Sequence, residues 1–338
     1  MSTSLSGRDR QITRRSLGRS IRKAVEALRR GGLVAFPTET VYGLGARVFD
    51  PVAIRRIFAA KGRPADNPLI VHVSTQGQLK LLVLDVPPVA RKLMDCFWPG
   101  PLTLVLRRSE TVPPLVSAGL CTVAIRMPDH PVALALIREL GEPIAAPSAN
   151  RSGRPSPTRA EHVVAEFGDA VDMVLEGGPC RVGLESTVVD LTGAIPCILR
   201  PGAVTVEVLQ SVIGRVIPFR PISKRQMVHS PGLKHRHYAP HFKVVPISSE
   251  DWVLALDRWC DSGKRLGMFC RTGIVKQKGL VYYRRVSGAE SKYGRDLFAV
   301  FREAEAAGVE VLLVESVSKK GLGVAIMDRL ERAAQNRV

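Results

Sequence analysis

The sequence predicts an α/β protein with two domains, a mixed sheet with covering helices followed by a small Rossmann-like α/β domain. The length of 338 residues favours two domains, and 45% apolar residues suffice for a packed core. Strand and helix patterns alternate irregularly at first and regularly from residue 243. The expected division is a basic extension at 1–20, a first domain at 21–215, a connector at 216–241 and a second domain at 242–338.

In the first domain, amphipathic spacing marks the helices and short apolar runs mark the strands. Ile21, Val25 and Leu28, for example, recur at helical spacing. Helices are predicted at 20–30, 51–60, 131–140 and 206–213, with another starting near Ser156. Strands are predicted at 32–36, 69–73, 102–106, 122–128, 143–146, 171–175, 186–191 and 195–199. The last two strands flank a Thr-Gly turn and should form a hairpin.

The second domain follows the pattern of a doubly wound parallel sheet. Strands are predicted at 244–247, 266–270, 281–286 and 309–314, and helices at 251–260, 296–306 and 325–334. The glycine spacing of residues 318–323 (SKKGLG) fits no phosphate-binding pattern, so this segment is predicted to be a tight turn before the last helix.

Composition argues for a cytoplasmic protein. No apolar run approaches the ~18–20 residues of a transmembrane helix, and the N-terminus lacks the apolar core of a signal peptide. Residues 1–20 are rich in Ser and Arg and are read as a basic tail, with a transit peptide as the alternative. The six cysteines are scattered without a Cys-x-x-Cys pair, and we expect reduced, mostly buried thiols.

The net charge of +18 is concentrated in two segments. Residues 1–20 carry five arginines and one acid, and residues 216–241 carry five basic residues and no acid. Such positions suit a polyanion, either nucleotide phosphates or RNA. The alternative is a basic surface that serves solubility alone.

The central candidate site is the segment 36–45 (FPTETVYGLG). An apolar strand pattern ends there in a polar loop with one carboxylate, Glu39. Gly43 and Gly45 permit close backbone approach or a positive φ. A strand that runs into a polar loop is typical of a small-molecule site, although an ordinary strand–turn–helix connection has the same pattern.

Two basic residues follow in a Gly/Pro-rich loop, 61–69 (KGRPADNPL). In an extended segment residues two apart point the same way, so Lys61 and Arg63 can converge on one phosphate, unless the loop is merely solvated. Arg126 lies amid apolar neighbours in a strand and should meet an anion, because burying it unpaired is costly. His72 also lies within a strand, as either a ligand or a satisfied core residue.

The connector contains residues 230–241 (SPGLKHRHYAPH), which are unlike a featureless spacer. His235, His237 and His241 could be zinc ligands, but no cysteine or carboxylate lies nearby in the sequence to complete a zinc site. We favour a lid over a nucleotide, with Tyr238 stacking or donating a hydrogen bond. Because neither a Walker nor a Rossmann glycine pattern occurs, loops and side chains must hold any nucleotide.

In order along the chain, these motifs resemble the Sua5/YrdC/YciO family. The matching segments are 36–45, 61–69, 99–103 (PGPLT), 124–128 (AIRMP), 146–150 (APSAN), 185–189 (ESTVV) and 200–202 (RPG). The connector motif at 230–240 is similar to the two-domain Sua5 branch. The resemblance covers the chain after residue 20 and is weakest in the second domain. It implies a YrdC-like twisted sheet around a positively charged hollow.

The resemblance also implies a cytoplasmic nucleotidyltransferase, a threonylcarbamoyl-AMP synthase. Such an enzyme converts L-threonine, bicarbonate and ATP to threonylcarbamoyl-AMP, pyrophosphate and water, the first step of t6A37 modification of tRNA. It implies Mg²⁺ on the ATP phosphates and no confident metal ligand from the protein, with Glu39 as one group that could orient the ion through water. Contacts with tRNA or with the downstream threonylcarbamoyl transferase are left open. No membrane partner is expected.

Site residues are assigned through the matching motifs. The residues expected to act on the phosphates are Lys61, Arg63, Ser148 and Asn150. The ATP site is expected to include Arg63, Asn67, Thr122, Ser148, Ser156, Arg200 and Tyr238. Threonine is expected at Thr40, His72, Arg126, Ala146 and Ser186. One departure from the family pattern is His235, where an aromatic residue such as Tyr is expected.

Two other functions fit parts of the sequence. The net charge supports an RNA-binding module without catalysis, although RNP-type aromatic residues are absent. A carbamoyl-adenylate-forming enzyme, like the related domain of hydrogenase-maturation carbamoyltransferases, would share the first-domain motifs. Those proteins carry zinc fingers, however, and this chain has no Cys-x-x-Cys pair.

Overall fold

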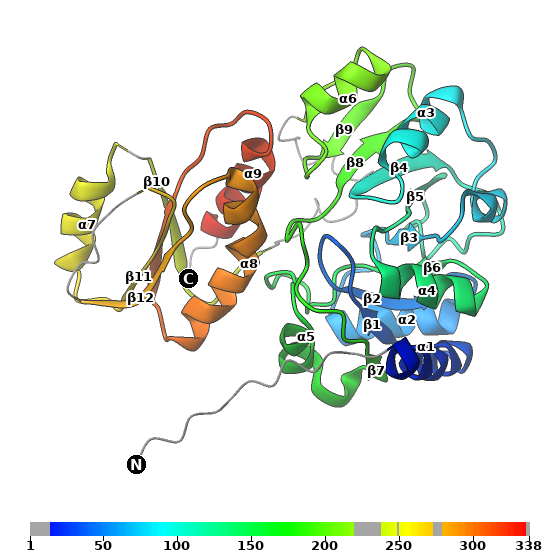
Figure 1. The fold of residues 1–338 in the computed structure, drawn as a ribbon, viewed down its shortest axis with the longest axis horizontal. Coiled ribbons are helices and arrows are strands. Elements are labelled where there is room, and N and C mark those ends of the chain that lie inside the picture. Colours follow the sequence, from blue (N-terminus) through cyan, green and yellow to red (C-terminus); the bar gives the residue numbers. More distant parts are fainter. Residues whose placement is uncertain (1–13, 220–237, 249, 273–278, 336–338) are drawn as a thin grey trace.

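The computed structural model describes residues 14–219, 238–248, 250–272 and 279–335, arranged as two sheets with their helices (Figure 1). The first part of the chain builds a large mixed sheet, and the last part builds a smaller parallel one. This is the α/β architecture that the sequence predicts. The connector residues 220–237, with His235 and His237, lie outside the described residues.

The large sheet has nine strands in the order β7-β1-β2-β6-β3-β5-β4-β8-β9. Their bounds are β1 (Val34–Phe36), β2 (Gly43–Arg47), β3 (Ile70–His72), β4 (Leu102–Arg107), β5 (Thr122–Arg126), β6 (Ile144–Ala145), β7 (Met173–Val174), β8 (Thr187–Asp190) and β9 (Cys197–Arg200). β3 pairs parallel with β5 and antiparallel with β6, so the sheet is mixed. β8 and β9 pair antiparallel, which confirms the predicted hairpin.

The helices of the first domain form two apolar layers. They are α1 (Arg14–Arg29), α2 (Pro51–Lys61), α3 (Pro88–Phe97), α4 (Pro131–Leu140), α5 (Ala160–Phe167) and α6 (Val206–Ile213), with short 3₁₀ turns at Gln76–Leu81 and Gly168–Ala170. α1 and α4 pack together over the β1 and β6 region through residues such as Leu28 and Ile137. The remaining helices share a second apolar cluster with residues of the sheet, including Val71 and Ile125.

The second domain has four parallel strands in the order β10-β13-β11-β12. Its elements are β10 (Lys243–Ile247), α7 (Trp252–Cys260), β11 (Leu266–Cys270), β12 (Leu280–Arg285), α8 (Glu290–Ala306), β13 (Val311–Glu315) and α9 (Gly323–Ala334). Side chains alternate between the sheet's two faces. Met268 therefore packs with α7, whereas Phe269 packs with α8 and α9. Helices α8 and α9 lie on the side that faces the first domain (Figure 1).

Two element boundaries differ clearly from the sequence prediction, and one helix was not predicted. Residues 14–20, assigned to the basic extension, form the first turns of α1, because Leu17 continues the apolar stripe into the core. α8 begins at Glu290 rather than 296, since Tyr293 is buried and extends its inner face. Helix α3 is an element that the sequence analysis missed.

The segment 36–45 is a β-hairpin rather than a strand and an irregular loop. Phe36 pairs with Gly43 and Val34 with Gly45, so residues 37–42 form the connection. Neither glycine has a positive φ. A Cβ on Gly45 would instead lie 2.7 Å from the Phe36 ring and 2.8 Å from Ile144. Close packing is thus the reason for glycine at this position.

Gly45→Ala is expected to destabilise the protein by about 1–3 kcal/mol, as in other overpacked cores. Phe36 and Ile144 are fully buried and cannot move aside cheaply. The free energy of unfolding from urea denaturation measures the effect. Gly18→Ala is the control, because nothing lies within 4 Å of a Cβ there and alanine favours the helix. Equal stability of the two variants would contradict this account.

The cysteines and helix lengths bear on two other expectations. Only Cys180 and Cys270 are buried, while Cys96, Cys121 and Cys260 are exposed, so the prediction of mostly buried thiols is wrong. Among the described helices, none has the length and apolarity to cross a membrane.

Candidate active site

An open hollow lies above one face of the large sheet. Strand alternation places Ile70 and His72 of β3 and Arg126 of β5 at the hollow, whereas Val71 and Ile125 point into the core. The residues that line it are Thr38, Thr40, Val41, Gly43, Arg63, Pro68, Ile70, His72, Arg126, Ala146, Pro147, Ser148, Glu185, Ser186, Arg200 and Tyr238. The site therefore draws on the β1–β2 loop, several strand ends and the connector.

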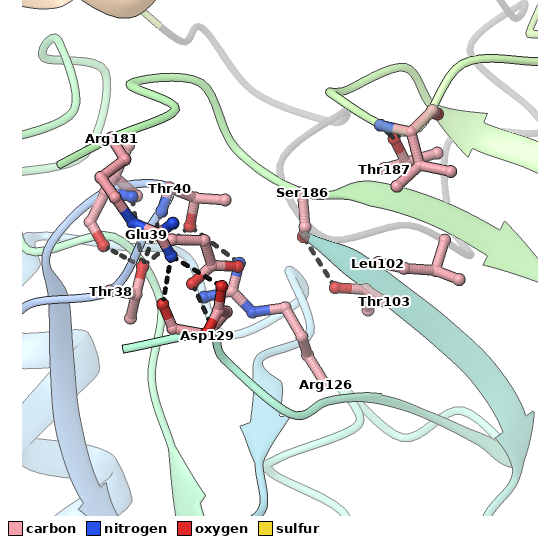
Figure 2. A network of polar contacts seen from close by, with 12 residues as sticks. Thr38, Glu39, Thr40, Leu102, Thr103, Arg126, Asp129, Arg181, Ser186 and Thr187 are labelled. Carbon is pink, nitrogen blue, oxygen red and sulfur yellow. Dashed lines mark hydrogen bonds and ion pairs between the residues drawn. The ribbon is translucent and has the colours of Figure 1, made fainter. Parts of the chain in front are cut away.

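Arg126 connects β5 to the β1–β2 loop (Figure 2). Its Nη1 donates to Thr40 Oγ1 at 2.7 Å and lies 3.5 Å from Glu39 Oε1. Glu39 is fixed in turn, because its Oε2 accepts the backbone N–H of Asp129 at 3.1 Å. The Nε of Arg126 has no hydrogen-bond partner within the described part of the chain. The guanidinium is thus oriented from one side and retains donor capacity for a carboxylate.

Arg200, at the end of β9, lies against Ser186. Its Nε and Nη2 donate to the Ser186 carbonyl at 3.0 and 2.9 Å, and Nη2 also contacts Ser186 Oγ at 3.1 Å. Ser186 Oγ also bonds Thr103 Oγ1 at 2.7 Å, as Figure 2 shows. These contacts tie the 185–186 segment to the end of β9 and hold Arg200 at the hollow.

Lys61 is the last residue of α2, and Gly62 ends the helix in the left-handed region. Arg63 follows directly after Gly62. Arg63 lines the hollow, and its Nη2 donates to the Pro68 carbonyl at 2.9 Å. Lys61 is buried behind it, where Nζ donates to the carbonyls of Ser148 and Asn150. Lys61 therefore ties α2 to the 148–150 turn, and Arg63 is the member of the pair that faces the hollow.

The hollow has cationic walls from which water is largely removed. Burial, and then the charge of the nearby Arg200, lower the pKa of Arg63 to about 10. Burial likewise lowers the pKa of Arg200 and of Arg126, although Tyr238 and Glu185 oppose the shift at Arg200 and Glu39 opposes it at Arg126. A desolvated cation is costly without a counter-ion. An anionic ligand between these three arginines would offset that cost.

His72 enters the hollow as a neutral side chain. Burial, and then the charge of Arg126, hold its pKa well below the usual range. Its Nδ1 lies 3.2 Å from the Ile70 carbonyl oxygen, and hydrogen bonding to the backbone of Ile70 and Ile144 partly opposes the fall in its pKa. Its ring lies edge-on to Phe36 at a centroid distance of 5.9 Å. His72 thus adds no charge to the hollow.

Tyr238 and Glu185 close the side of the hollow that borders the second domain. Tyr238 has φ of 66°, a conformation that needs support from its surroundings. Its ring stacks on Phe298 of α8 at 5.2 Å. Glu185 accepts a hydrogen bond from Ser156 Oγ at 2.5 Å and pairs with Arg329 of α9 at 3.2 Å.

The structure gathers most of the sequence-predicted residues around the hollow. The predicted residues that line it are Thr40, Arg63, His72, Arg126, Ala146, Ser148, Ser186, Arg200 and Tyr238. Lys61, Asn150 and Ser156 are buried just behind the lining and bond its neighbours. Asn67 is also buried, and its carbonyl accepts from Arg63. Thr122 begins β5, at the opposite end of that strand from Arg126.

The sequence analysis missed several residues of the site. Glu185 has the same signal as Arg126, a charged residue beside an apolar strand pattern, but it was not assigned. Thr38 lines the hollow, and its hydroxyl donates to the Val41 carbonyl at 2.6 Å, which shapes the loop. Arg329 had a signal too, because it stands on the apolar stripe of α9 with Ile326 and Leu330.

The described residues offer no evident site for a resident metal. Over residues 14–219 and the later described ranges, no group of three or more His, Cys, Asp or Glu side chains could hold a metal ion. Of the histidines in the zinc hypothesis, only His241 is described, and it is exposed beside Glu305. Glu39 is engaged with Arg126 and with a backbone N–H. The donor set of the hollow thus suits anions.

Comparison with known proteins gives two family matches that together span almost the whole chain. The Sua5/YciO/YrdC family model, described as Telomere recombination, matches residues 26–202. A second model, described as Threonylcarbamoyl-AMP synthase, C-terminal domain, matches residues 204–335.

Individual relatives match over similar lengths. A Threonylcarbamoyl-AMP synthase of Pyrococcus abyssi is 44% identical over 94% of this chain and 95% of its own. One of Bacillus subtilis is 43% identical over 94% of each. A crystal structure of P. abyssi Sua5 complexed with L-threonine superposes with a TM-score of 0.88 at 44% identity, covering 93% of this chain and 94% of the other.

Proposed function

Because the chain belongs to the Sua5/YrdC/YciO family, we infer that it is a threonylcarbamoyl-AMP synthase of the two-domain Sua5 type. It is a nucleotidyltransferase that acts on L-threonine. We propose that bicarbonate and ATP are the other substrates and that the product serves t6A37 modification of tRNA in the cytoplasm. The observation that carries the inference is the hollow, whose three buried arginines face one space.

We propose that L-threonine lies among Thr40, His72, Arg126, Ala146 and Ser186, which all line the hollow. The guanidinium of Arg126 is the natural partner of the amino acid carboxylate, because two planar groups can share parallel hydrogen bonds. Glu39 and Thr40 hold that guanidinium in place. The neutral His72 adds a polar side chain to this part of the hollow without adding a charge.

We propose that the ATP phosphates lie toward Arg63 and Arg200, with Ser148 nearby. Lys61, Asn67, Asn150 and Ser156 would act from behind, by fixing the backbone that these groups share. Tyr238 closes this side of the hollow. The assignment of Thr122 stays a prediction.

The chemistry requires positioning more than proton transfer. The amine of threonine takes up bicarbonate with loss of water and becomes an N-carboxylate. One carboxylate oxygen then attacks the α-phosphorus, the bond to the bridging oxygen breaks, and pyrophosphate leaves. Negative charge shifts to the leaving group, and fixed guanidiniums stabilise that charge without reorganisation. Arg63 and Arg200 are suited to this role.

We propose that Mg²⁺ binds to the ATP phosphates. Among the described residues, Glu185 is the one carboxylate that lines the hollow, and it is already paired with Arg329, so we expect the phosphates to supply the ligands. When bound, Mg²⁺ would neutralise phosphate charge and favour departure of pyrophosphate.

Pyrophosphate release by the purified protein tests this function. The assay contains ATP and Mg²⁺, and L-threonine or bicarbonate is omitted in turn. Release that requires both is the expected result. Release that requires neither would indicate another ATPase, and no release would favour the RNA-binding alternative. Exchange driven by carbamoyl phosphate but not by threonine would indicate the carbamoyl-adenylate reaction.

Arg126→Lys is expected to raise the KM for L-threonine by about tenfold or more, because a point charge cannot replace the planar fork. The KM for ATP should change little. Lysine keeps a cation beside Glu39, which protects the fold. Initial rates at varied threonine measure the change. An unchanged threonine KM, or an equal rise for ATP, would refute this role of Arg126.

A further inference from the structure

The second domain forms part of the synthase site. Leu184 and Tyr238 belong to the apolar cluster of the second domain, as does Val41 of the β1–β2 loop. Val41 and Tyr238 also line the hollow. The first domain's site is therefore packed directly on α8 and α9.

The segment that carries Glu185 and Ser186 lies directly on α8. Gly183 has φ of 72°, and a Cβ there would lie 2.1 Å from the Arg295 carbonyl oxygen. Gly294 of α8 leaves space for Leu184, because a Cβ at position 294 would lie 3.1 Å from the Leu184 side chain. This fit leaves residues 183–186 little freedom to shift relative to the second domain.

Arg329 reaches from α9 into the same segment and is fully buried. Its Nε lies 3.2 Å from Glu185 Oε2, and its Nη1 donates to the Pro201 carbonyl at 2.8 Å. Its guanidinium also lies over the Tyr238 ring at 5.6 Å. One side chain of the second domain therefore contacts both segments that carry Ser186 and Arg200.

Glu185 is a buried carboxylate that interacts with two cations, Arg329 and Arg200. Burial by itself would raise its pKa, but Arg329 and then Arg200 lower it below the usual value, with help from Ser156. Arg329 makes the direct contact, which leaves Arg200 free to bond Ser186 and face the hollow. Without Arg329, the nearest cation for a buried carboxylate would be Arg200 itself. A buried charge that loses its partner must find another or be neutralised.

We propose that Arg329 is a positioning residue for the synthase: it occupies Glu185 so that Arg200 stays directed at the ATP phosphates. The proposal rests on the function inferred above. It gives the second domain a defined role in the reaction, as the source of the counter-ion that holds one wall of the site. Arg329 itself does not line the hollow.

The test compares steady-state kinetics of Arg329→Met and the wild-type protein. Arg329→Met is expected to raise the KM for ATP by about tenfold or more, because Glu185 then draws Arg200 away. A role in domain packing alone would lower the amount of active protein and leave that KM unchanged. Isothermal titration with ATP alone gives a second readout that is independent of turnover.

Two further variants keep the result decisive. Arg329→Lys retains a cation and should recover much of the ATP affinity. The double variant Glu185→Gln with Arg329→Met removes the charge that would attract Arg200 and retains an acceptor for Ser156. It should bring the ATP KM back to within about threefold of the wild-type value, a coupling that a double-mutant cycle isolates. If the double variant is no better than Arg329→Met, the proposal is wrong.

Arg332→Met is the matched control, because Arg332 lies one turn later on α9 and its Nε donates to Asp328 of the same helix at 2.9 Å. Its ATP KM should equal the wild-type value, and an equal rise in both arginine variants would overturn the proposal.

The wild-type protein in the same assay separates failure of the proposed function from failure of the role of Arg329. If it releases no pyrophosphate with threonine and bicarbonate, the proposed function fails. If it does and Arg329→Met behaves identically, only the role of Arg329 fails.

Discussion

Arg63→Ala is expected to lose most of the threonine-dependent pyrophosphate release while the protein stays folded. Arg63 lines the hollow close to Arg200, and its cation is already desolvated. Removing it takes away a charge-assisted contact to phosphate worth about 1.5–3 kcal/mol, or about 10- to 100-fold in kcat/KM. Arg63 also donates to the buried carbonyls of Asn67 and Pro68, so we expect the variant to fold but to be less stable.

Initial rates at varied ATP, with thermal unfolding as a check of folding, measure the effect. Lys61→Met is the variant to compare with Arg63→Ala, because Lys61 donates to the carbonyls of Ser148 and Asn150 instead of facing the hollow. We expect it also to lose most of the activity, but with a lower unfolding temperature, since two buried carbonyls lose their donor. Wild-type turnover in folded Arg63→Ala would exclude Arg63 from the phosphate site, and wild-type turnover in folded Lys61→Met would show that the Lys61 contacts do not support that site.

A chain truncated after residue 215 is expected to use ATP very poorly or not at all. The truncation removes Tyr238 from the hollow and Arg329 from Glu185. It also exposes Leu184 and Val41, which pack in the second domain's apolar cluster. The remaining sheet would keep most of its own core, but one wall of the site would have no support.

Tyr238→Ala in the full-length chain separates these effects. It removes the ring that lines the hollow, stacks on Phe298 and lies beneath the Arg329 guanidinium, but it keeps both members of the Arg329–Glu185 ion pair. The ATP KM should rise by about tenfold, as expected for loss of one stacked aromatic contact. Tyr238→Phe keeps the stacking and distinguishes the ring from its hydroxyl. An unchanged ATP KM in Tyr238→Ala would show that the connector acts only as a spacer.

The sequence by itself determined the fold class and the family, because both depend on local patterns. Apolar periodicity predicted most elements, including the β8–β9 hairpin and the four parallel strands of the second domain. The pattern of neighbouring residues singled out Arg63 and Arg126, and the family motifs added Arg200. All three side chains line the same hollow.

Only the tertiary structure decided which of these residues face the hollow and which lie behind it. Two cations two residues apart suggest a shared phosphate, yet the end of α2 at Gly62 directs Lys61 to backbone carbonyls and Arg63 to the hollow. Likewise, the contact between Arg329 and Glu185 joins residues separated by 144 positions. Propensity and periodicity describe near neighbours along the chain. Which distant charges must neutralise each other is set by how the two domains exclude water between them.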